Sequence, residues 1–287
     1  MNNSIKYTIF LVLLLLCSCR KSVENSEKPL IFVTIEPQRY FIEQLVDTLF
    51  RVETMTPPGA SPETYDPLPE KMSALAKAKA YFSVGHLGFE EAWLDKLQKN
   101  YPQILFFETG EGITPIATEH RHGNHIHTGI DPHIWTSPLQ ALKMADNMRK
   151  ALISIDSINA EVYNNNFLTL RKKILSLNKQ IREILGSVSR KAFIIYHPAL
   201  GYFARDYGLE QLAMENDGKE PSPMQLKMLL KTASEKHITT VFIQQEFDRK
   251  NAESIAKSAG CKLVEINPLS YNWEEETLKI ANALKDE

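Results

Sequence analysis

The fold of this chain is decided by residues 157–186, SINAEVYNNNFLTLRKKILSLNKQIREILG. Apolar residues recur there every three or four positions, which is the pattern of one stripe on an amphipathic helix. They are Phe167, Leu170, Ile174, Leu177, Ile181 and Ile184. No proline interrupts the stretch, and Gly186 is a suitable C-terminal stop. At 1.5 Å per residue the helix would be about 40 Å long, which suits a rigid connection between two lobes.

Short apolar runs lie on both sides of this helix, and loops and helical patterns follow them. Before it we expect strands at 30–35, 52–55, 81–84 and 104–108, and helices at 40–49 and 70–80. After it we expect strands at 192–196, 209–214, 239–244 and 261–266. This order predicts an α/β fold: two lobes with mostly parallel sheets, residues 29–156 and 187–287, joined by one long rigid helix at 157–186.

The first residues of the chain predict export and a lipid anchor. Lys6 precedes the apolar run from Ile9 to Leu16, which is too short to span a bilayer and is typical of a secretory signal. The following Leu16-Cys17-Ser18-Cys19 resembles a bacterial lipoprotein processing site, with Cys19 the better lipid acceptor and Cys17 the alternative. An ordinary cleaved signal is the other interpretation. We therefore expect a lipoprotein signal peptide at 1–18 and a polar tether at 19–28.

Composition excludes several classes of protein. The formal net charge is −2 and no basic run follows the signal, which argues against a nucleic-acid partner. Cys261 is the only cysteine beyond the signal region, so we expect no internal disulfide and no thiolate-rich metal site. Any metal must be bound by nitrogen and oxygen.

Five of the eight histidines lie between His120 and Pro138. His133 is held in Asp131-Pro-His-Ile-Trp135, where proline and apolar neighbours indicate a fixed backbone. The other four lie in a Gly- and Asn-containing run that we expect to be neither regular helix nor strand. We interpret them as a mobile collector of metal ions; they are His120, His122, His125 and His127.

Other polar residues follow predicted strands, where ligands of parallel sheets bind. His197 and Glu246 come at or just after strand ends in the second half, as does Asn267, and Glu63 lies in a proline-rich loop after an early strand. Each alone is more simply a loop or surface residue. Together with His133 they make a site in a cleft between the lobes a reasonable hypothesis.

At this point the sequence resembles the periplasmic metal-binding lipoproteins of zinc and manganese ABC transporters (ZnuA- and TroA-like). The resemblance covers nearly the whole chain after the signal. It rests on matching segments that include PPGASPETYDP (57–67), GHLGFEEAW (85–93), DPHIW (131–135) and HPALGYFARDYG (197–208). It implies two α/β lobes joined by one long helix, with the metal ion between them.

By family position the implied ligands are Glu63, His133, His197 and Asn267. The family usually has histidine at the position of Glu63 and aspartate at that of Asn267, so this chain departs twice from the pattern. Glu246 is our candidate to replace the missing carboxylate. Zinc accepts histidine nitrogen and carboxylate oxygen as ligands. At a given site it usually binds more tightly than Mn²⁺ or Fe²⁺, so we expect Zn²⁺, with those two ions as alternatives.

The resemblance implies capture and delivery without bond chemistry. The partners would be an ABC permease and its ATPase, and the protein would be a monomer, lipid-anchored on the periplasmic side of a bacterial membrane. One alternative is a zinc hydrolase with the same His, His and Glu set, although no H-E-x-x-H motif is present. Another is a lipoprotein adhesin with a metal-binding loop.

Overall fold

The computed structural model describes residues 28–122, 125–215 and 221–285. The predicted signal peptide, Cys19 and all of the tether except Lys28 lie outside these residues. Among the helices that are described, none combines the length and the apolar character needed to cross a membrane.

The first lobe is built on a parallel sheet with strand order β2-β1-β3-β4. Its strands are β1 (Leu30–Val33), β2 (Arg51–Thr54), β3 (Ala78–Ser83) and β4 (Leu105–Glu108). The helices between them are α2 (Glu36–Val46), α3 (Pro69–Leu75) and α4 (Gly88–Asn100). One face of β1 packs against a cluster with Met55, Leu75 and Phe89, so α3 and α4 cover that face.

The second lobe repeats this architecture with strand order β10-β9-β7-β8, again all parallel. Its strands are β7 (Ala192–Ile195), β8 (Glu210–Ala213), β9 (Thr240–Gln244) and β10 (Lys262–Ile266). Its helices are α7 (Gly201–Tyr207), α8 (Pro223–Glu235), α9 (Arg249–Ala259) and α10 (Trp273–Ala283).

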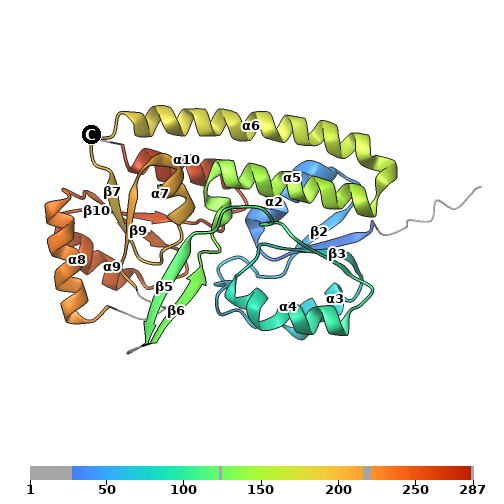
Figure 1. Ribbon diagram of the computed structural model, residues 1–287, viewed down its shortest axis with the longest axis horizontal. Coiled ribbons are helices and arrows are strands. Elements are labelled where there is room, and N and C mark those ends of the chain that lie inside the picture. The colour runs from blue at the N-terminus through green and yellow to red at the C-terminus, as the bar shows by residue number, and fades with distance from the viewer. Residues whose placement is uncertain (1–27, 123–124, 216–220, 286–287) are drawn as a thin grey trace, which may run out of the picture.

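The long helix α6 (Ala160–Gly186) has 27 residues and runs along one side of both lobes (Figure 1). A short 3₁₀ turn, η2 (Ser157–Asn159), joins it to α5 (Pro138–Ile155), which lies beside it. Four residues of the predicted stripe are buried in a core cluster that also includes residues of α2, β1 and β7, and Phe167 and Ile184 pack against this cluster partly buried. The prediction of two parallel α/β lobes with one long helix is therefore confirmed.

Two predicted helices have other bounds in the structure. The helix expected over residues 40–49 spans Glu36–Val46. The helix expected over residues 70–80 ends at Leu75, and Ala78 and Ala80 belong to β3. Alanine favours helices, but the strand pairs with β1 and β4 on its two sides. Burial between two strands outweighs the intrinsic preference of these small residues.

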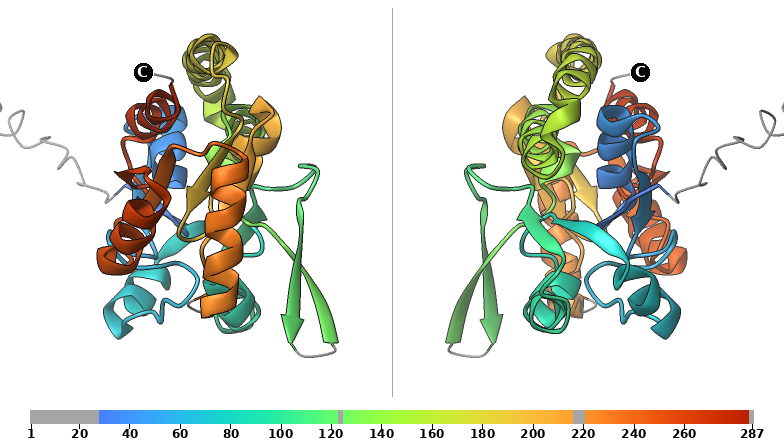
Figure 2. Two further views of the ribbon diagram at one scale, coloured as in Figure 1. Left: turned by 90° about the vertical axis from the view of Figure 1, so that its left-hand side faces the viewer. Right: turned by 90° about the vertical axis from the view of Figure 1, so that its right-hand side faces the viewer.

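The histidine run is also more regular than expected, so that prediction is wrong as well. Residues Ala117–His122 (β5) and His125–Ile130 (β6) form an antiparallel two-stranded sheet. Only Gly123 and Asn124 separate the strands in the sequence, and a two-residue Gly-Asn connection is a signal for a hairpin. The hairpin projects away from both parallel sheets (Figure 2).

Candidate metal centre

Three residues from separate loops converge between the lobes. One ligand atom from each of Glu63, His133 and His197 lies within 4.8 Å of the others. Glu63 comes from the proline-rich loop after β2, and His133 directly precedes the 3₁₀ turn η1 (Ile134–Thr136). His197 follows β7 by one residue, at the carboxyl end of the second sheet. Two nitrogens and one carboxylate oxygen are a ligand set that Zn²⁺ accepts.

The ring of His133 is fixed by the carboxylate two residues before it. Oδ1 of Asp131 accepts hydrogen bonds from the backbone N–H of His133, at 2.9 Å, and from its Nδ1, at 2.8 Å. Both side chains are buried, which keeps water from competing. With Nδ1 as the donor, Nε2 carries the lone pair that can bind a metal.

His197 is held in the same way from the second lobe. Its Nδ1 hydrogen-bonds to Oε1 of Glu215, and the Glu215 side chain is buried. Glu215 follows β8, which pairs directly with β7, so the two residues meet at one edge of the sheet. A carboxylate that accepts from the non-ligating nitrogen of a histidine is the usual outer partner of a metal ligand, because it fixes the tautomer and raises the basicity of the ring.

The Nε2 atoms of the two histidines face each other. Nε2 of His133 lies 3.3 Å from Nε2 of His197. With both Nδ1 atoms donating, two lone pairs would meet here, and they repel unless a proton or a cation lies beside them. Zinc–nitrogen bonds of about 2.0–2.1 Å at a tetrahedral angle place two nitrogens roughly 3.3 Å apart. The spacing therefore fits one bound zinc ion.

Glu63 divides its two oxygens between the protein and the site. Oε2 accepts a hydrogen bond from the backbone N–H of Gly88, at 3.0 Å, where helix α4 begins. Oε1 is buried, has no hydrogen-bond partner among the described residues, and lies 3.9 Å from Nε2 of His133. A buried carboxylate oxygen without a partner is costly, and a cation between Glu63 and the histidines would satisfy it.

The two residues considered for the fourth ligand differ in their surroundings. Glu246 lines the small pocket around Glu63, His133 and His197, which has a volume of about 20 Å³. Asn267 does not line this pocket; it lines an adjacent larger cavity. Its amide oxygen accepts from the N–H of Leu269, at 3.1 Å, and its amide nitrogen donates to Gln245, at 3.2 Å.

Charge and burial oppose each other at this site. Burial alone would lower the pKa of His133, but nearby carboxylates, Asp131 first among them, outweigh it and raise that pKa above its ordinary value. Burial raises the pKa of Glu246, and a backbone hydrogen bond and the two nearby histidines only partly offset this rise. Metal binding at Nε2 requires the unprotonated ring of His133, so binding should weaken as the pH falls.

Three parts of this centre are not among the residues predicted from the sequence: Asp131, Glu215 and the N–H of Gly88. Two of them had a signal. Asp131 stands two residues before a proposed ligand, and Glu215 directly follows a predicted strand that could neighbour the strand before His197. The contact between Gly88 and Glu63 joins two loops that are 25 residues apart, and nothing in the sequence pairs them.

The hairpin carries the other four histidines in two register pairs. His120 is opposite His127, and His122 is opposite His125. Because residues i and i+2 of a strand lie on the same side, this backbone register puts all four positions on one face of the hairpin.

Comparisons with known proteins place the chain in a family. The family model described as "Zinc-uptake complex component A periplasmic" (ZnuA) matches residues 31–280. The zinc-binding lipoprotein AdcA of Streptococcus pneumoniae R6 is 28% identical over 276 residues, which cover 92% of this chain but 54% of AdcA. The chain thus spans about half the length of that relative.

Two further relatives are matched over most of their length. The high-affinity zinc uptake system protein ZnuA of Bacillus subtilis is 27% identical over 263 residues, with 88% of this chain and 82% of that protein covered. The crystal structure of a ZnuA deletion mutant with zinc bound superposes with a TM-score of 0.83 at 35% identity, covering 90% of this chain and 99% of that one. The chain belongs to the ZnuA family of periplasmic zinc-uptake components.

Proposed function

We propose that this protein captures Zn²⁺ between its two lobes and delivers it to an ABC permease for uptake. Glu63, His133 and His197 would be three ligands, and Glu246 the fourth. The observation that carries the proposal is the pair of facing Nε2 atoms, 3.3 Å apart, whose rings are both held by carboxylates at Nδ1. The named zinc proteins among its relatives support zinc as the cargo.

Oxygen ligands make the set more tolerant of other ions. Glu63 supplies oxygen where the resemblance leads us to expect a histidine nitrogen, and Mn²⁺ and Fe²⁺ accept oxygen well. Zinc still exceeds both in affinity at a given nitrogen and oxygen site. Mn²⁺ and Fe²⁺ are therefore the alternative cargoes, and Asn267 remains the competing fourth ligand.

The size of the pocket supports binding over hydrolysis. A volume of about 20 Å³ is room for little more than one water-sized particle. An ester or peptide substrate of a zinc hydrolase must bring its scissile carbonyl to the metal, and this pocket has no space for one. We therefore propose a binding protein rather than an enzyme.

The cellular context is part of the same proposal. Residues 1–18 would be a lipoprotein signal peptide, 19–28 a tether lipidated at Cys19, and the protein a monomer on the periplasmic side of the membrane. Residues 29–156 and 187–287 would form the two lobes around the linking helix at 157–186. The permease and its ATPase would take the metal ion from the binding protein.

Equilibrium zinc binding to metal-free protein tests the proposal. We expect one tight zinc ion per chain, and a loss of at least 100-fold in affinity for His133→Ala and for His197→Ala, since each removes one ligand of the centre. His86→Ala is the matched control, because His86 is exposed and lies outside the cluster. Wild-type affinity in both site variants would contradict the proposal, as would zinc-dependent hydrolysis of ester or peptide substrates.

A further inference from the structure

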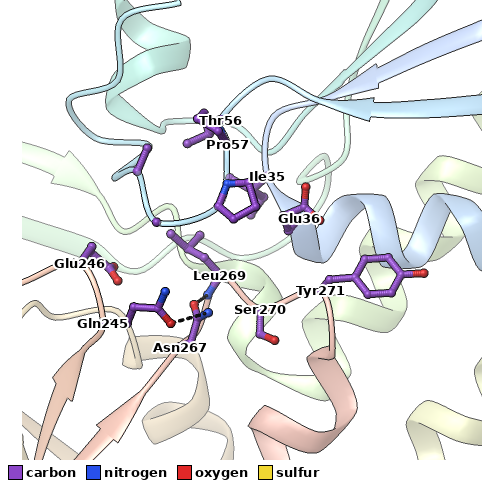
Figure 3. Close-up of a pocket in the computed structure, with 13 residues that line it drawn as sticks. Ile35, Glu36, Thr56, Pro57, Gln245, Glu246, Asn267, Leu269, Ser270 and Tyr271 are labelled. Atoms are coloured by element: carbon purple, nitrogen blue, oxygen red, sulfur yellow. Dashed lines mark hydrogen bonds between the residues drawn. The ribbon is translucent and has the colours of Figure 1, made fainter.

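A second, larger cavity lies next to the metal pocket. It has a volume of about 150 Å³ and is formed by loops of both lobes (Figure 3). The first lobe contributes residues around Glu36 and the segment Thr56–Ala60, and the second contributes Gln245, Glu246 and the segment after β10. We call this cavity the vestibule.

The vestibule and the metal pocket share two lining residues, Glu246 and Leu269. Glu246 thus faces the ion site on one side and the larger cavity on the other. The two volumes differ in what they can hold. The metal pocket has room for roughly one water-sized particle, whereas the vestibule can hold several waters around an ion.

The lining of the vestibule offers oxygen rather than nitrogen or sulfur. None of its thirteen lining residues is histidine or cysteine. Glu36 and Glu246 bring carboxylates from the two lobes, and Figure 3 shows them on opposite sides of the cavity. Arg39 lies 3.5 Å from one oxygen of Glu36, but its shorter contact, at 2.8 Å, is with Glu43. The cavity therefore keeps an excess of negative charge.

Two other features keep the vestibule polar. At its edge the side-chain amide of Asn267 donates a hydrogen bond to that of Gln245 (Figure 3), which fixes both amides. Ser270 also lines the cavity and adds a hydroxyl group to it. Hard cations with their water shells bind to carboxylate, amide and hydroxyl oxygens of this kind.

We propose that the vestibule is the entry route of the cargo: a hydrated divalent cation is held there first, and Glu246 passes it to the histidines as its water is lost. This inference rests on the proposed function, because it names the path to the same centre. It assigns Glu36, which takes no part in the final site, a role in the rate of capture.

A residue on the path but outside the final site has a distinctive kinetic effect. It stabilises the ion during both entry and exit, so its loss slows both steps and leaves the equilibrium affinity nearly unchanged. Loss of a ligand of the final site has a different effect: it weakens the affinity, mainly because the dissociation rate rises. Association and dissociation rates together therefore separate the two roles.

Stopped-flow mixing of the purified protein with ZnCl₂ tests the proposal. Trp135 lines the metal pocket with its ring 5.2 Å from that of His133, so its fluorescence can report on binding. A chelator in excess gives the dissociation rate. For Glu36→Gln we expect association and dissociation both to slow on the order of tenfold, because one of the two carboxylates that stabilise the passing ion is lost.

A second variant tests the route by steric means. Ala60→Phe places a ring in the vestibule, and it should slow both rates while one tight zinc ion per chain remains. The controls are Glu275→Gln, which removes an exposed charge elsewhere, and Ala92→Phe, which adds a ring on the surface of α4. Both should keep wild-type rates.

The outcomes separate this inference from the proposed function. Wild-type protein that binds no zinc tightly would overturn the function itself. Tight binding with unchanged rates in Glu36→Gln and Ala60→Phe would overturn only the vestibule. Slower association with unchanged dissociation in Glu36→Gln would also overturn it, because that result indicates steering from a distance rather than passage.

Discussion

At the scale of single residues, two buried carboxylates orient the histidines that we propose as ligands. Asp131 and Glu215 each accept from the Nδ1 of one histidine, and both are buried. These two contacts fix the orientation of the rings, so that the lone pairs of both Nε2 atoms point toward one position. Glu63 is oriented differently, because its carboxylate accepts a hydrogen bond from a backbone N–H at the start of a helix. The N-terminus of a helix favours a negatively charged group, so this position suits a carboxylate better than a neutral imidazole.

We predict that Asp131→Asn and Glu215→Gln weaken zinc binding by about 10- to 100-fold, although neither residue contacts the ion. Each substitution keeps the size of the side chain and an oxygen acceptor, but it removes the charge that makes the ring basic. Competition with a chelator of known affinity measures the change. Asp95→Asn is the control, because Asp95 is exposed on α4. Wild-type affinity in both variants would show that the two carboxylates only fill space.

At the scale of elements, two glycines allow loops to approach the centre closely. A Cβ on Gly88 would lie 2.3 Å from the carbonyl oxygen of Glu63, and one on Gly201 would lie 2.2 Å from Oδ2 of Asp131. Both distances are far below van der Waals contact. The loop that carries Glu63 therefore requires a glycine at the start of α4, and the position of Asp131 requires a glycine at the start of α7.

Gly88→Ala should accordingly reduce zinc affinity at least tenfold, since the loop that carries Glu63 must move away from the histidines. Gly201→Ala should act similarly through Asp131. Isothermal titration with Zn²⁺ measures both, and circular dichroism checks that the fold is kept. The matched control is Gly186→Ala, where a Cβ would meet nothing within 4 Å. If the three alanine variants bound zinc equally, the close approach of these loops would be irrelevant to the site.

A buried carboxylate on α4 predicts how stability depends on pH. Burial raises the pKa of Glu90 to about 7, and hydrogen bonds from Thr34 and from the backbone N–H groups of Val84 and Gly85 only partly offset it. The folded state then binds more protons than the unfolded state between pH about 4.5 and about 7. The contribution of Glu90 to the free energy of unfolding is therefore fully present below that range. It is lost as the pH rises through the range, and the total loss is about 3 kcal/mol.

Urea unfolding at pH 5 and pH 8 measures this loss. Glu90→Gln should be less dependent on pH over that range, because the amide carries no proton to lose. Glu91→Gln, the exposed neighbour, should keep the slope of the wild type. An unchanged slope in Glu90→Gln would mean that other groups govern the pH dependence.

The elements also show what the sequence could and could not predict. The stripe of α6 and the strands on both sides of it can be predicted from the sequence, because apolar residues recur in each with the pattern of a buried helix face or a buried strand. The β3 boundary was not, because alanines that favour a helix are placed in a strand by their neighbours in the sheet. The sequence predicts His133 from its fixed Asp131-Pro-His-Ile-Trp135 segment and His197 from its place at a strand end, whereas the contact of Gly88 with Glu63 depends on how two distant loops pack.

At the scale of the whole molecule, the two lobes are fastened together around the centre. Trp135 donates a hydrogen bond to the carbonyl oxygen of Pro268, at 2.8 Å, and Trp273 donates one to the carbonyl oxygen of Trp135, also at 2.8 Å. Trp273 of α10 also packs against Phe41 of α2, with ring centroids 4.9 Å apart. Both indole contacts are buried, and α6 spans both lobes. Wide opening of the cleft would break them, so we expect small loop movements to accompany capture and release.

The histidine hairpin is separate from this fastened body and projects from it (Figure 2), so its role should be separable too. We predict that serine at positions 120, 122, 125 and 127 leaves the tight zinc ion in place, with an affinity within about twofold of the wild type, because sites without shared partners act independently. Any additional, weaker zinc bound by the wild type should disappear, since we propose that the four histidine positions on one face of the hairpin collect metal ions.

Metal analysis after dialysis, followed by titration with Zn²⁺, measures both populations. The reciprocal variant, His133→Ala with the hairpin intact, should lose the tight ion and keep the weak ones. Replacing Arg121 alone by serine is the control for changes in the hairpin that leave its histidines. If the four serines abolished tight binding while His133→Ala preserved it, the hairpin would be the principal site, and the centre between the lobes would have to be given up.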